Sequence, residues 1–230
     1  SVTAEKIQRE FGKLFFRFLI TKHPVNLPNE IAGKGSNETW AAKQVKSLII
    51  DPEQIAPEDI LVSVFDADTQ IGKDYFGILT HKFLSVPKRH NASYEPVPLF
   101  VNNILQAPAF ARVIAFSTTF WQMMQQSRRE ELTTFSSHSM PWKALVEIGY
   151  WHTNFVSEDS HIFWQCYLYY NGDWRVEPLF YPVYMDANAA PSFWQTIRNL
   201  YKQQRRWSWG VENIPYLLYG FFKNRKIPLR

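Results

Sequence analysis

The sequence is poor in cysteine, with Cys166 the only one among 230 residues. A single thiol excludes an internal disulfide framework and is typical of a protein from a reducing compartment. Cys166 stands within the aromatic run of residues 163–167, which indicates a buried and unreactive thiol.

Long hydrophobic runs are missing as well. No stretch of about eighteen apolar residues occurs, so the sequence predicts no segment that spans a bilayer by itself. The N-terminus has neither an initiating methionine nor the apolar core of a signal peptide. We therefore expect the chain to be a piece of a longer protein.

The signatures of several function classes are absent. The six histidines form no His-Glu-x-x-His pair or Cys/His cluster, which disfavours a zinc enzyme. Gly-x-Ser-x-Gly is missing, so Ser136, Ser137 and Ser139 around His138 favour a hydrogen-bonding substrate loop over a serine nucleophile. No zinc-finger spacing, Gly-rich RNA-binding motif or regular basic helix occurs, and we predict no nucleic-acid partner.

Aromatic residues are abundant instead, at 17% of the chain. Such rings suit protein cores, platforms for sugar rings and membrane interfaces. The net charge of +4 comes mainly from residues 202–206 and 223–230, a distribution suited to anionic lipid or to a phosphate-bearing ligand.

The order of the predicted elements indicates an α/β fold in one domain. We predict helices over residues 4–14, 37–47, 75–84, 109–131, 141–148, 158–170 and 192–209, and extended segments over 15–21, 60–65, 94–101 and 174–184. The apolar run 60–65 is typical of a strand buried on both faces, so we expect a mostly parallel mixed sheet flanked by helices.

Two aspartates, Asp66 and Asp68, follow the strand predicted over residues 60–65. Ligands bind at the carboxyl ends of strands in such sheets, and Mg²⁺ and Mn²⁺ prefer oxygen ligands of this kind. The pair is therefore a candidate metal site, with a solvated turn as the alternative.

A second acidic pair, Glu158 and Asp159, starts a predicted helix that Ser157 is placed to cap. The charges can simply stabilise the helix start. They can also supply a carboxylate base that takes a proton from an attacking hydroxyl.

The last predicted helix carries residues 203–209, in which Arg206 and Trp207 offer a cationic fork for a diphosphate and an indole for a sugar ring. A solvated basic face with a buried Trp is the alternative reading. Lys34, in a Gly-Lys-Gly loop that lacks full P-loop spacing, is a further candidate phosphate contact.

Taken in order, these motifs resemble the family 2 glycosyltransferases of GT-A type, which include cellulose, chitin and hyaluronan synthases. Asp66-Ala67-Asp68 follows a strand, Ser157-Glu158-Asp159 stands where the family has Thr-Glu-Asp, and residues 203–207 fit its Gln-x-x-Arg-Trp. Residues 135–159 also look like the acceptor region of this group.

The resemblance implies an inverting, metal-dependent transfer of a sugar from a nucleotide diphosphate donor, most simply a UDP-sugar, to a hydroxyl of a glycan or lipid acceptor. It assigns Mg²⁺ or Mn²⁺ to Asp66 and Asp68, catalysis to Asp159 as general base beside Glu158, the donor diphosphate to Lys34, Gln203 and Arg206, and the acceptor to Trp207 and His138.

Nothing before Phe15 supplies the family's first strand and its nucleoside-binding loop. We therefore expect a partial catalytic domain over residues 1–210, incomplete at that strand. The aromatic and basic residues of 211–230 predict an interfacial segment leading toward a membrane, on its cytoplasmic face.

Two other functions stay open from the sequence. A non-catalytic carbohydrate-binding or membrane-docking module would explain the aromatic residues without catalysis. A metal-dependent nucleotidyltransferase would share the acidic metal site, but it would leave residues 203–207 without a purpose.

Overall fold

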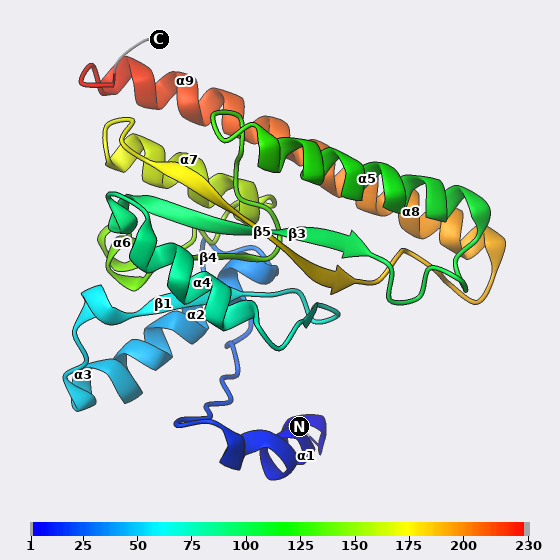
Figure 1. Ribbon diagram of the computed structural model, residues 1–230, viewed down its shortest axis with the longest axis horizontal. Coiled ribbons are helices and arrows are strands. Elements are labelled where there is room, and N and C mark those ends of the chain that lie inside the picture. Colours follow the sequence, from blue (N-terminus) through cyan, green and yellow to red (C-terminus); the bar gives the residue numbers. More distant parts are fainter. Residues whose placement is uncertain (1, 228–230) are drawn as a thin grey trace.

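The computed structural model describes residues 2–227, and a five-stranded mixed sheet flanked by helices forms its centre (Figure 1). The strands are β1 (Leu61–Val64), β2 (Gln70–Ile71), β3 (Ala92–Phe100), β4 (His138–Pro141) and β5 (Arg175–Met185), in the order β1-β4-β3-β5-β2. The predicted α/β class and the mixed, helix-flanked sheet are confirmed.

The strand directions correct the expectation of a mostly parallel sheet. Among the described strands only β3 and β5 pair in parallel, whereas β1–β4, β3–β4 and β2–β5 are antiparallel. β1 pairs only with β4, so it is an edge strand, and its residues are half-buried rather than fully buried. An apolar run in the sequence indicates that a strand is covered by other parts of the protein, but it does not indicate whether the neighbouring strands run parallel or antiparallel to it.

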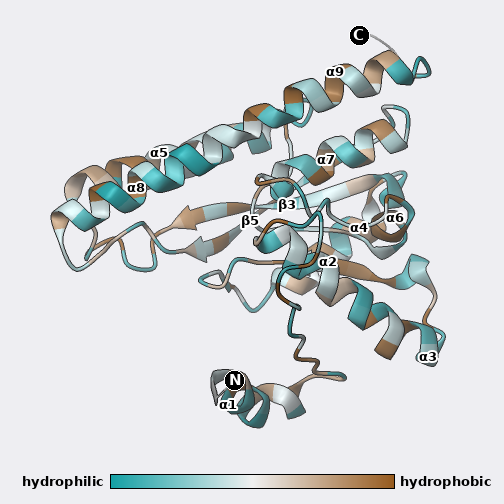
Figure 2. Ribbon diagram, turned by 180° about the vertical axis from the view of Figure 1, so that it is seen from behind, coloured by the Kyte–Doolittle hydropathy of each residue, from teal (hydrophilic) through white to brown (hydrophobic). Residues whose placement is uncertain are grey.

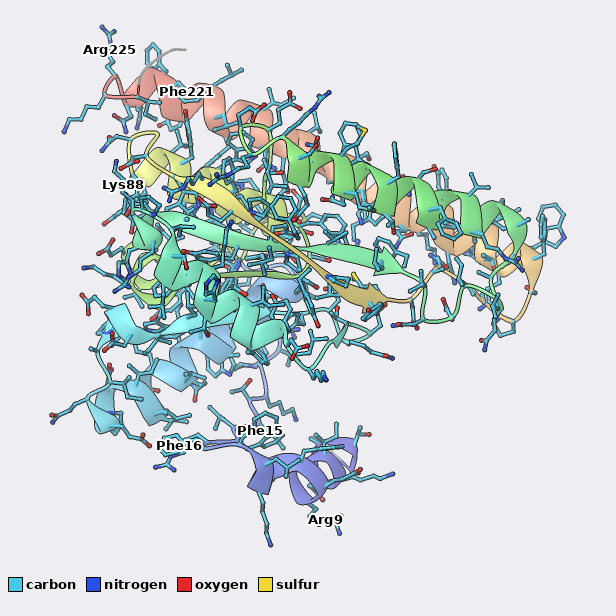
Figure 3. The ribbon with its side chains drawn as sticks, in the orientation of Figure 1. Arg9, Phe15, Phe16, Lys88, Phe221 and Arg225 are labelled. Atoms are coloured by element: carbon cyan, nitrogen blue, oxygen red, sulfur yellow. The ribbon has the colours of Figure 1, made fainter. Side chains whose placement is uncertain are left out.

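The predicted strand over residues 15–21 is wrong. Helix α1 (Val2–Phe11) and the short turn Gly12–Leu14 confirm the helix before it, but no strand is described before β1. Phe15 and Phe16 are 59% and 78% exposed on an extended segment that leads away from α1 (Figure 3). The segment pairs with no described strand, and Phe15 and Phe16 stay largely exposed.

The other predicted helices are confirmed within a few residues. They are α2 (Lys34–Val45), α4 (Tyr75–Ser85), α5 (Ala109–Ser127), α6 (Trp142–Glu147), α7 (Glu158–Tyr169) and α8 (Phe193–Ser208). Two helices were not predicted: α3 (Asp51–Glu53), which α2 reaches through a wider turn (Lys46–Ile50), and α9 (Asn213–Lys223). Ser192 Oγ accepts a hydrogen bond from the Gln195 N–H at 3.2 Å and caps α8. Ser157 precedes α7, but its hydroxyl makes no capping bond.

Helix α5 packs along β3, where Thr119 Oγ1 donates to the Pro98 carbonyl at 3.1 Å, and α8 lies beside α5 (Figure 1). A small apolar cluster joins them, in which Ala111 and Ala115 of α5 pack with Ala187 and with Leu200 of α8. Hydrophilic and hydrophobic residues alternate along both helices, so each also presents a mixed outer surface (Figure 2).

The C-terminal helix α9 packs on α7. The Tyr216 ring lies 4.4 Å from that of His161, and Phe221 lies 6.4 Å from Tyr167. Large apolar residues on the rest of α9 are exposed, including Ile214, Leu218 and Phe222. In the described part of the chain no helix is both long and apolar enough to cross a bilayer. Residues 228–230 of the predicted interfacial segment lie outside the described residues.

Candidate active site

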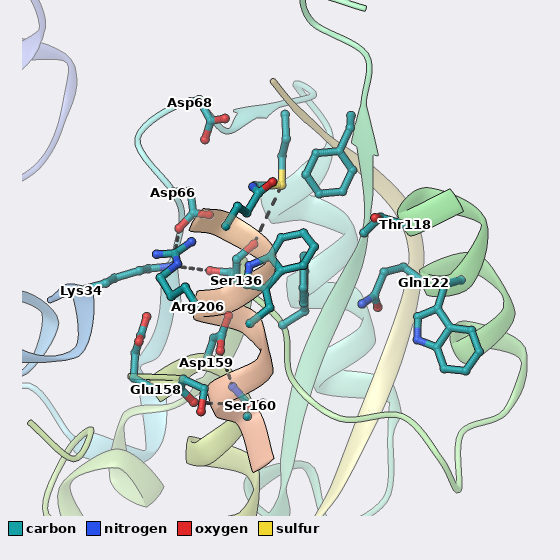
Figure 4. Close-up of a pocket in the computed structure, with 18 of the residues that line it drawn as sticks. Lys34, Asp66, Asp68, Thr118, Gln122, Ser136, Glu158, Asp159, Ser160 and Arg206 are labelled. Atoms are coloured by element: carbon teal, nitrogen blue, oxygen red, sulfur yellow. Dashed lines mark hydrogen bonds and ion pairs between the residues drawn. The ribbon is translucent and has the colours of Figure 1, made fainter. Parts of the chain in front are cut away.

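A pocket of about 520 Å³ lies at one end of the sheet (Figure 4). It collects residues from distant parts of the sequence, and all of the predicted site residues except His138 line it. These are Lys34, Asp66, Asp68, Glu158, Asp159, Gln203, Arg206 and Trp207.

Three strands that run in the same direction end at this pocket. β1 is antiparallel to β4, β4 is antiparallel to β3, and β3 is parallel to β5. Asp66 follows β1, Phe100 and Met185 end β3 and β5, and all three line the pocket. The site therefore lies at carboxyl ends of strands, where ligands bind in α/β sheets.

Lys34 holds the acidic turn after β1 in place. Its Nζ donates to Asp66 Oδ1 at 2.6 Å and to the Ser136 carbonyl at 2.5 Å. Burial lowers the pKa of Lys34, but the charges of Glu38 and Asp66 outweigh burial and raise it. Lys34 is therefore a fixed positive charge at the pocket wall.

Residues just after β5 and β3 hold the second aspartate of the turn, Asp68. Asp68 Oδ2 accepts a hydrogen bond from the Asp186 N–H at 3.1 Å, and the Asp68 carbonyl accepts one from Asn102 Nδ2 at 3.3 Å. The other carboxylate oxygens, Asp66 Oδ2 and Asp68 Oδ1, accept no hydrogen bond from a described residue. The turn thus offers two oxygen atoms toward a ligand.

Glu158 and Asp159 form the first turn of α7 and lie on the same side of the pocket as Lys34 and Asp66 (Figure 4). Burial and then the charge of Asp159 raise the pKa of Glu158 to about 7. Burial also raises the pKa of Asp159, against the Ser160 N–H that donates to Asp159 Oδ1 at 2.8 Å. Both carboxyl groups are thus closer to accepting a proton at neutral pH than an ordinary carboxylate.

Gly35 lets α2 approach this acidic pair. A Cβ at Gly35 would lie 2.9 Å from Glu158 Cβ and 3.2 Å from the His152 carbonyl oxygen. A Cβ contact of 2.9 Å essentially never occurs, so a larger residue at position 35 would push the first turn of α2 away from the first turn of α7.

Glu38, one turn after Lys34, is a charged neighbour that sequence reasoning missed. Burial raises its pKa to about 8, although Lys34 Nζ lies 3.6 Å away and lowers it. The charges of Glu158, Asp159 and Asp66 raise this pKa further. The spacing of four residues on a helix was a signal for the Lys34–Glu38 pair, but not for its burial.

The motif on α8 supplies the basic and aromatic part of the lining. Arg206 lines the pocket, and its guanidinium forms no hydrogen bond or ion pair with a described residue, which leaves it available for a ligand. The Trp207 ring lies 6.4 Å from that of Phe135 in an edge-on arrangement. Gln203 Oε1 accepts a hydrogen bond from Asn188 Nδ2 at 3.5 Å.

His138 does not reach the pocket. Its ring is buried in β4, and Nδ1 bonds with the Phe135 carbonyl at 2.9 Å. Burial lowers the pKa of His138 to about 4, so the ring is neutral. The segment predicted as a substrate loop is partly a strand, which is why the histidine faces the core and not an acceptor.

A match to a family model covers residues 61–229 and is described as glycosyl transferase family group 2. The chain belongs to this family. It is therefore a family 2 glycosyltransferase, as the ordered motifs implied. No curated protein and no solved structure matches the chain significantly.

The family match starts at β1, yet Lys34, which lies before it, also lines the pocket. Lys34 and Glu38 of α2 lie outside residues 61–229 but reach the acidic turns of this domain. The pocket is also lined by Asp186 and by a group on α5 that sequence reasoning missed: Ser117, Thr118, Trp121 and Gln122. The helical spacing of Thr118, Trp121 and Gln122 was the available signal for a shared face.

The protein offers few metal ligands of its own. Among residues 2–227, no group of three or more His, Cys, Asp or Glu side chains is placed to hold an ion. Mg²⁺ is nevertheless commonly bound through one or two carboxylates together with substrate phosphates. The free oxygens of Asp66 and Asp68 fit that pattern.

Proposed function

We propose that this glycosyltransferase moves a sugar from a UDP-sugar to an acceptor hydroxyl with inversion, in a single displacement with Asp159 as the general base. The observation that carries the proposal is the convergence of three elements on one pocket. They are the aspartate turn after β1, the acidic first turn of α7 and the basic face of α8.

The proposed base has suitable electrostatics. Asp159 lines the pocket, its pKa is raised by burial, and Oδ1 is fixed by the Ser160 N–H. General bases work best when their pKa approaches the working pH. Asp159 takes the proton of the acceptor hydroxyl as that oxygen attacks the anomeric carbon and the bond to the diphosphate breaks. The adjacent Glu158 adds a second carboxyl group to the same turn.

The departing diphosphate carries developing negative charge. Arg206 and Lys34 stabilise it from α8 and α2, with Gln203 as a neutral hydrogen-bonding neighbour. Preorganised charges of this kind are usually the largest catalytic contribution, because they need no reorganisation during the reaction.

Asp66 and Asp68 are the residues that would hold Mg²⁺ or Mn²⁺. A bound divalent ion supplies electrostatic stabilisation of the diphosphate as a Lewis acid. Support for an ion comes from the excess of carboxylates over cations in the lining, with Asp66, Asp68, Glu158, Asp159 and Asp186 facing Lys34 and Arg206.

We further propose that residues 211–230 rest on the cytoplasmic face of a membrane. The exposed apolar residues of α9 stand close in sequence to Lys223, Arg225 and Lys226. Apolar and basic residues together favour a surface of anionic lipid. The single, buried Cys166 agrees with a reducing compartment.

Calorimetric titration of UDP into the protein, with and without Mn²⁺, tests the proposal. We expect heat of binding that depends on the metal. A non-catalytic module would respond to neither metal nor nucleotide, so an absence of binding by UDP, GDP and ADP alike would refute nucleotide-sugar dependence.

A further inference from the structure

The glycosyltransferase pocket has a second wall of different chemistry, formed by one face of α5. Ser117, Thr118, Trp121 and Gln122 all line the pocket, and Thr118, Trp121 and Gln122 follow helical spacing. None of these side chains is ionisable. The one charged residue of α5, Arg112, is turned away and donates to the Ala107 carbonyl at 2.7 Å.

The polar and aromatic groups of this wall are available for a ligand. Gln122 makes no side-chain hydrogen bond with any residue in the described range, and Trp121 is 55% exposed although it lines a pocket. Thr118 Oγ1 donates to the Ile114 carbonyl at 2.9 Å, which leaves its oxygen free to accept. An amide, a hydroxyl and a half-exposed indole thus line the same pocket.

Figure 4 shows this wall across the cavity from the charged residues. Thr118 and Gln122 lie on one side, and Lys34, Asp66, Glu158 and Asp159 lie on the other. A pocket divided in this way suits a ligand with one reacting end and one neutral end.

We propose that the α5 wall is an acceptor subsite for a saccharide. This inference rests on the proposed function, in which the acceptor hydroxyl lies beside Asp159. The next sugar unit of the same glycan then lies against Trp121, and its hydroxyl groups form hydrogen bonds with Gln122 and Thr118. Neutral donors and acceptors beside an indole match an uncharged, polyhydroxylated ring with one apolar face. A phosphate group binds best to cationic side chains, and the α5 wall has none. An alkyl tail would leave the Gln122 amide without a hydrogen-bond partner, which costs free energy.

Acceptor length gives the test. UDP release is measured with UDP-glucose, UDP-galactose and UDP-N-acetylglucosamine, each with methyl β-glycosides of glucose, galactose, mannose and N-acetylglucosamine and with the matching β-linked di- and trisaccharides. For the acceptor that is used, we expect the KM of the disaccharide to be about tenfold below that of the monosaccharide, the equivalent of one good ring contact.

Trp121→Ala should remove this advantage, so that the KM of the disaccharide rises about tenfold to that of the monosaccharide. Gln122→Leu keeps the bulk of the side chain but removes its amide, and it should reduce the same advantage of the disaccharide. This second variant tests the subsite even if Trp121→Ala folds poorly. Phe120→Ala is the matched control, because Phe120 is 65% exposed on α5 and is not part of the lining. It should behave as the wild type.

The outcomes separate this subsite from the proposed function. A length advantage that survives Trp121→Ala overturns the subsite, and so does UDP binding without any acceleration by a saccharide. Transfer to a polyprenyl phosphate in detergent with the same KM in wild type and Trp121→Ala also overturns it, in favour of a lipid acceptor. A chain that binds no nucleotide overturns the proposed function and the subsite together.

Discussion

Glu212, in the turn between α8 and α9, holds the loop that carries the acidic pair. Its Oε1 accepts three hydrogen bonds, from the Val156 N–H at 3.0 Å, the Ser157 N–H at 3.2 Å and the Ser157 hydroxyl at 2.9 Å. These residues lead directly into Glu158 and Asp159. We predict that replacing Glu212 by Ala loosens this loop and weakens both stability and catalysis.

The magnitude follows from the three bonds. Hydrogen bonds to a charged group contribute about 1.5–3 kcal/mol each. The three share one oxygen, and the half-exposed site lets water replace part of them, so we expect Glu212→Ala to cost about 2–3 kcal/mol in total. For a chain of this size that lowers Tm by roughly 4–12 °C. Glu212→Gln keeps an acceptor oxygen and should cost less than about 1 kcal/mol.

Thermal unfolding followed by circular dichroism measures the stability difference, and UDP release measures kcat. We expect kcat to fall in Glu212→Ala at 20 °C, where the variant is folded, with the affinity for UDP unchanged, because the loop carries the base and not the donor contacts. Equal Tm values for wild type and Glu212→Ala would refute the reasoning. So would a Gln variant as damaged as the Ala variant.

Four further changes test the rest of the site. Asp159→Asn should lower kcat at least a hundredfold with metal-dependent UDP binding kept; a parallel loss of UDP affinity in calorimetry would contradict the base assignment. Asp68→Ala should weaken UDP binding and its response to Mn²⁺, and an unchanged metal requirement would argue against the ligand role. Gly35→Ala should destabilise the protein by about 1–3 kcal/mol, whereas Gly33→Ala, where a Cβ meets nothing within 4 Å, should not. Glu38→Gln should raise Tm increasingly as pH rises from 4.5 to about 8 and by a constant amount above that, because the pKa of Glu38 is raised from 4.5 to about 8 in the folded protein and the wild type loses stability across this window; a Tm difference that stays constant across the window would show that Glu38 titrates normally.

Local patterns predicted much of the fold. Apolar periodicity and flanking turn residues located α2, α4, α5, α7 and α8, because each helix carries its own signal in consecutive residues. The strand wrongly predicted over residues 15–21 has the same local signal as a real strand. It fails because a strand needs a partner, and no local pattern records whether one is present.

The parts of the site that the sequence left out depend on distant residues. Glu38 is an ordinary helical carboxylate until α2 packs against α7, and Glu212 is an ordinary acid until its turn meets the loop before Glu158. His138 stands in a segment rich in Ser and Thr that reads as a loop, yet pairing with Val64 makes it part of β4 and buries the ring. Burial and partners come from the tertiary structure, whereas residue types come from the sequence.

A pocket lies after residues 60–65, where the sequence predicts a ligand site, although the sheet is not mostly parallel. The rule that ligands bind at the carboxyl ends of strands needs only that several strands end together. β4 reverses direction between β1 and β3, so β1, β3 and β5 still point the same way and bring Asp66, Phe100 and Met185 to one pocket. The inserted antiparallel strand also sets Ser136, just before β4, beside the ends of its neighbours, and there its carbonyl binds Lys34. Because β4 runs opposite to β1 and β3, the Ser136 carbonyl lies at the pocket end of the sheet and accepts the bond from Lys34. In an all-parallel sheet, the start of this strand would lie at the other end, away from the pocket.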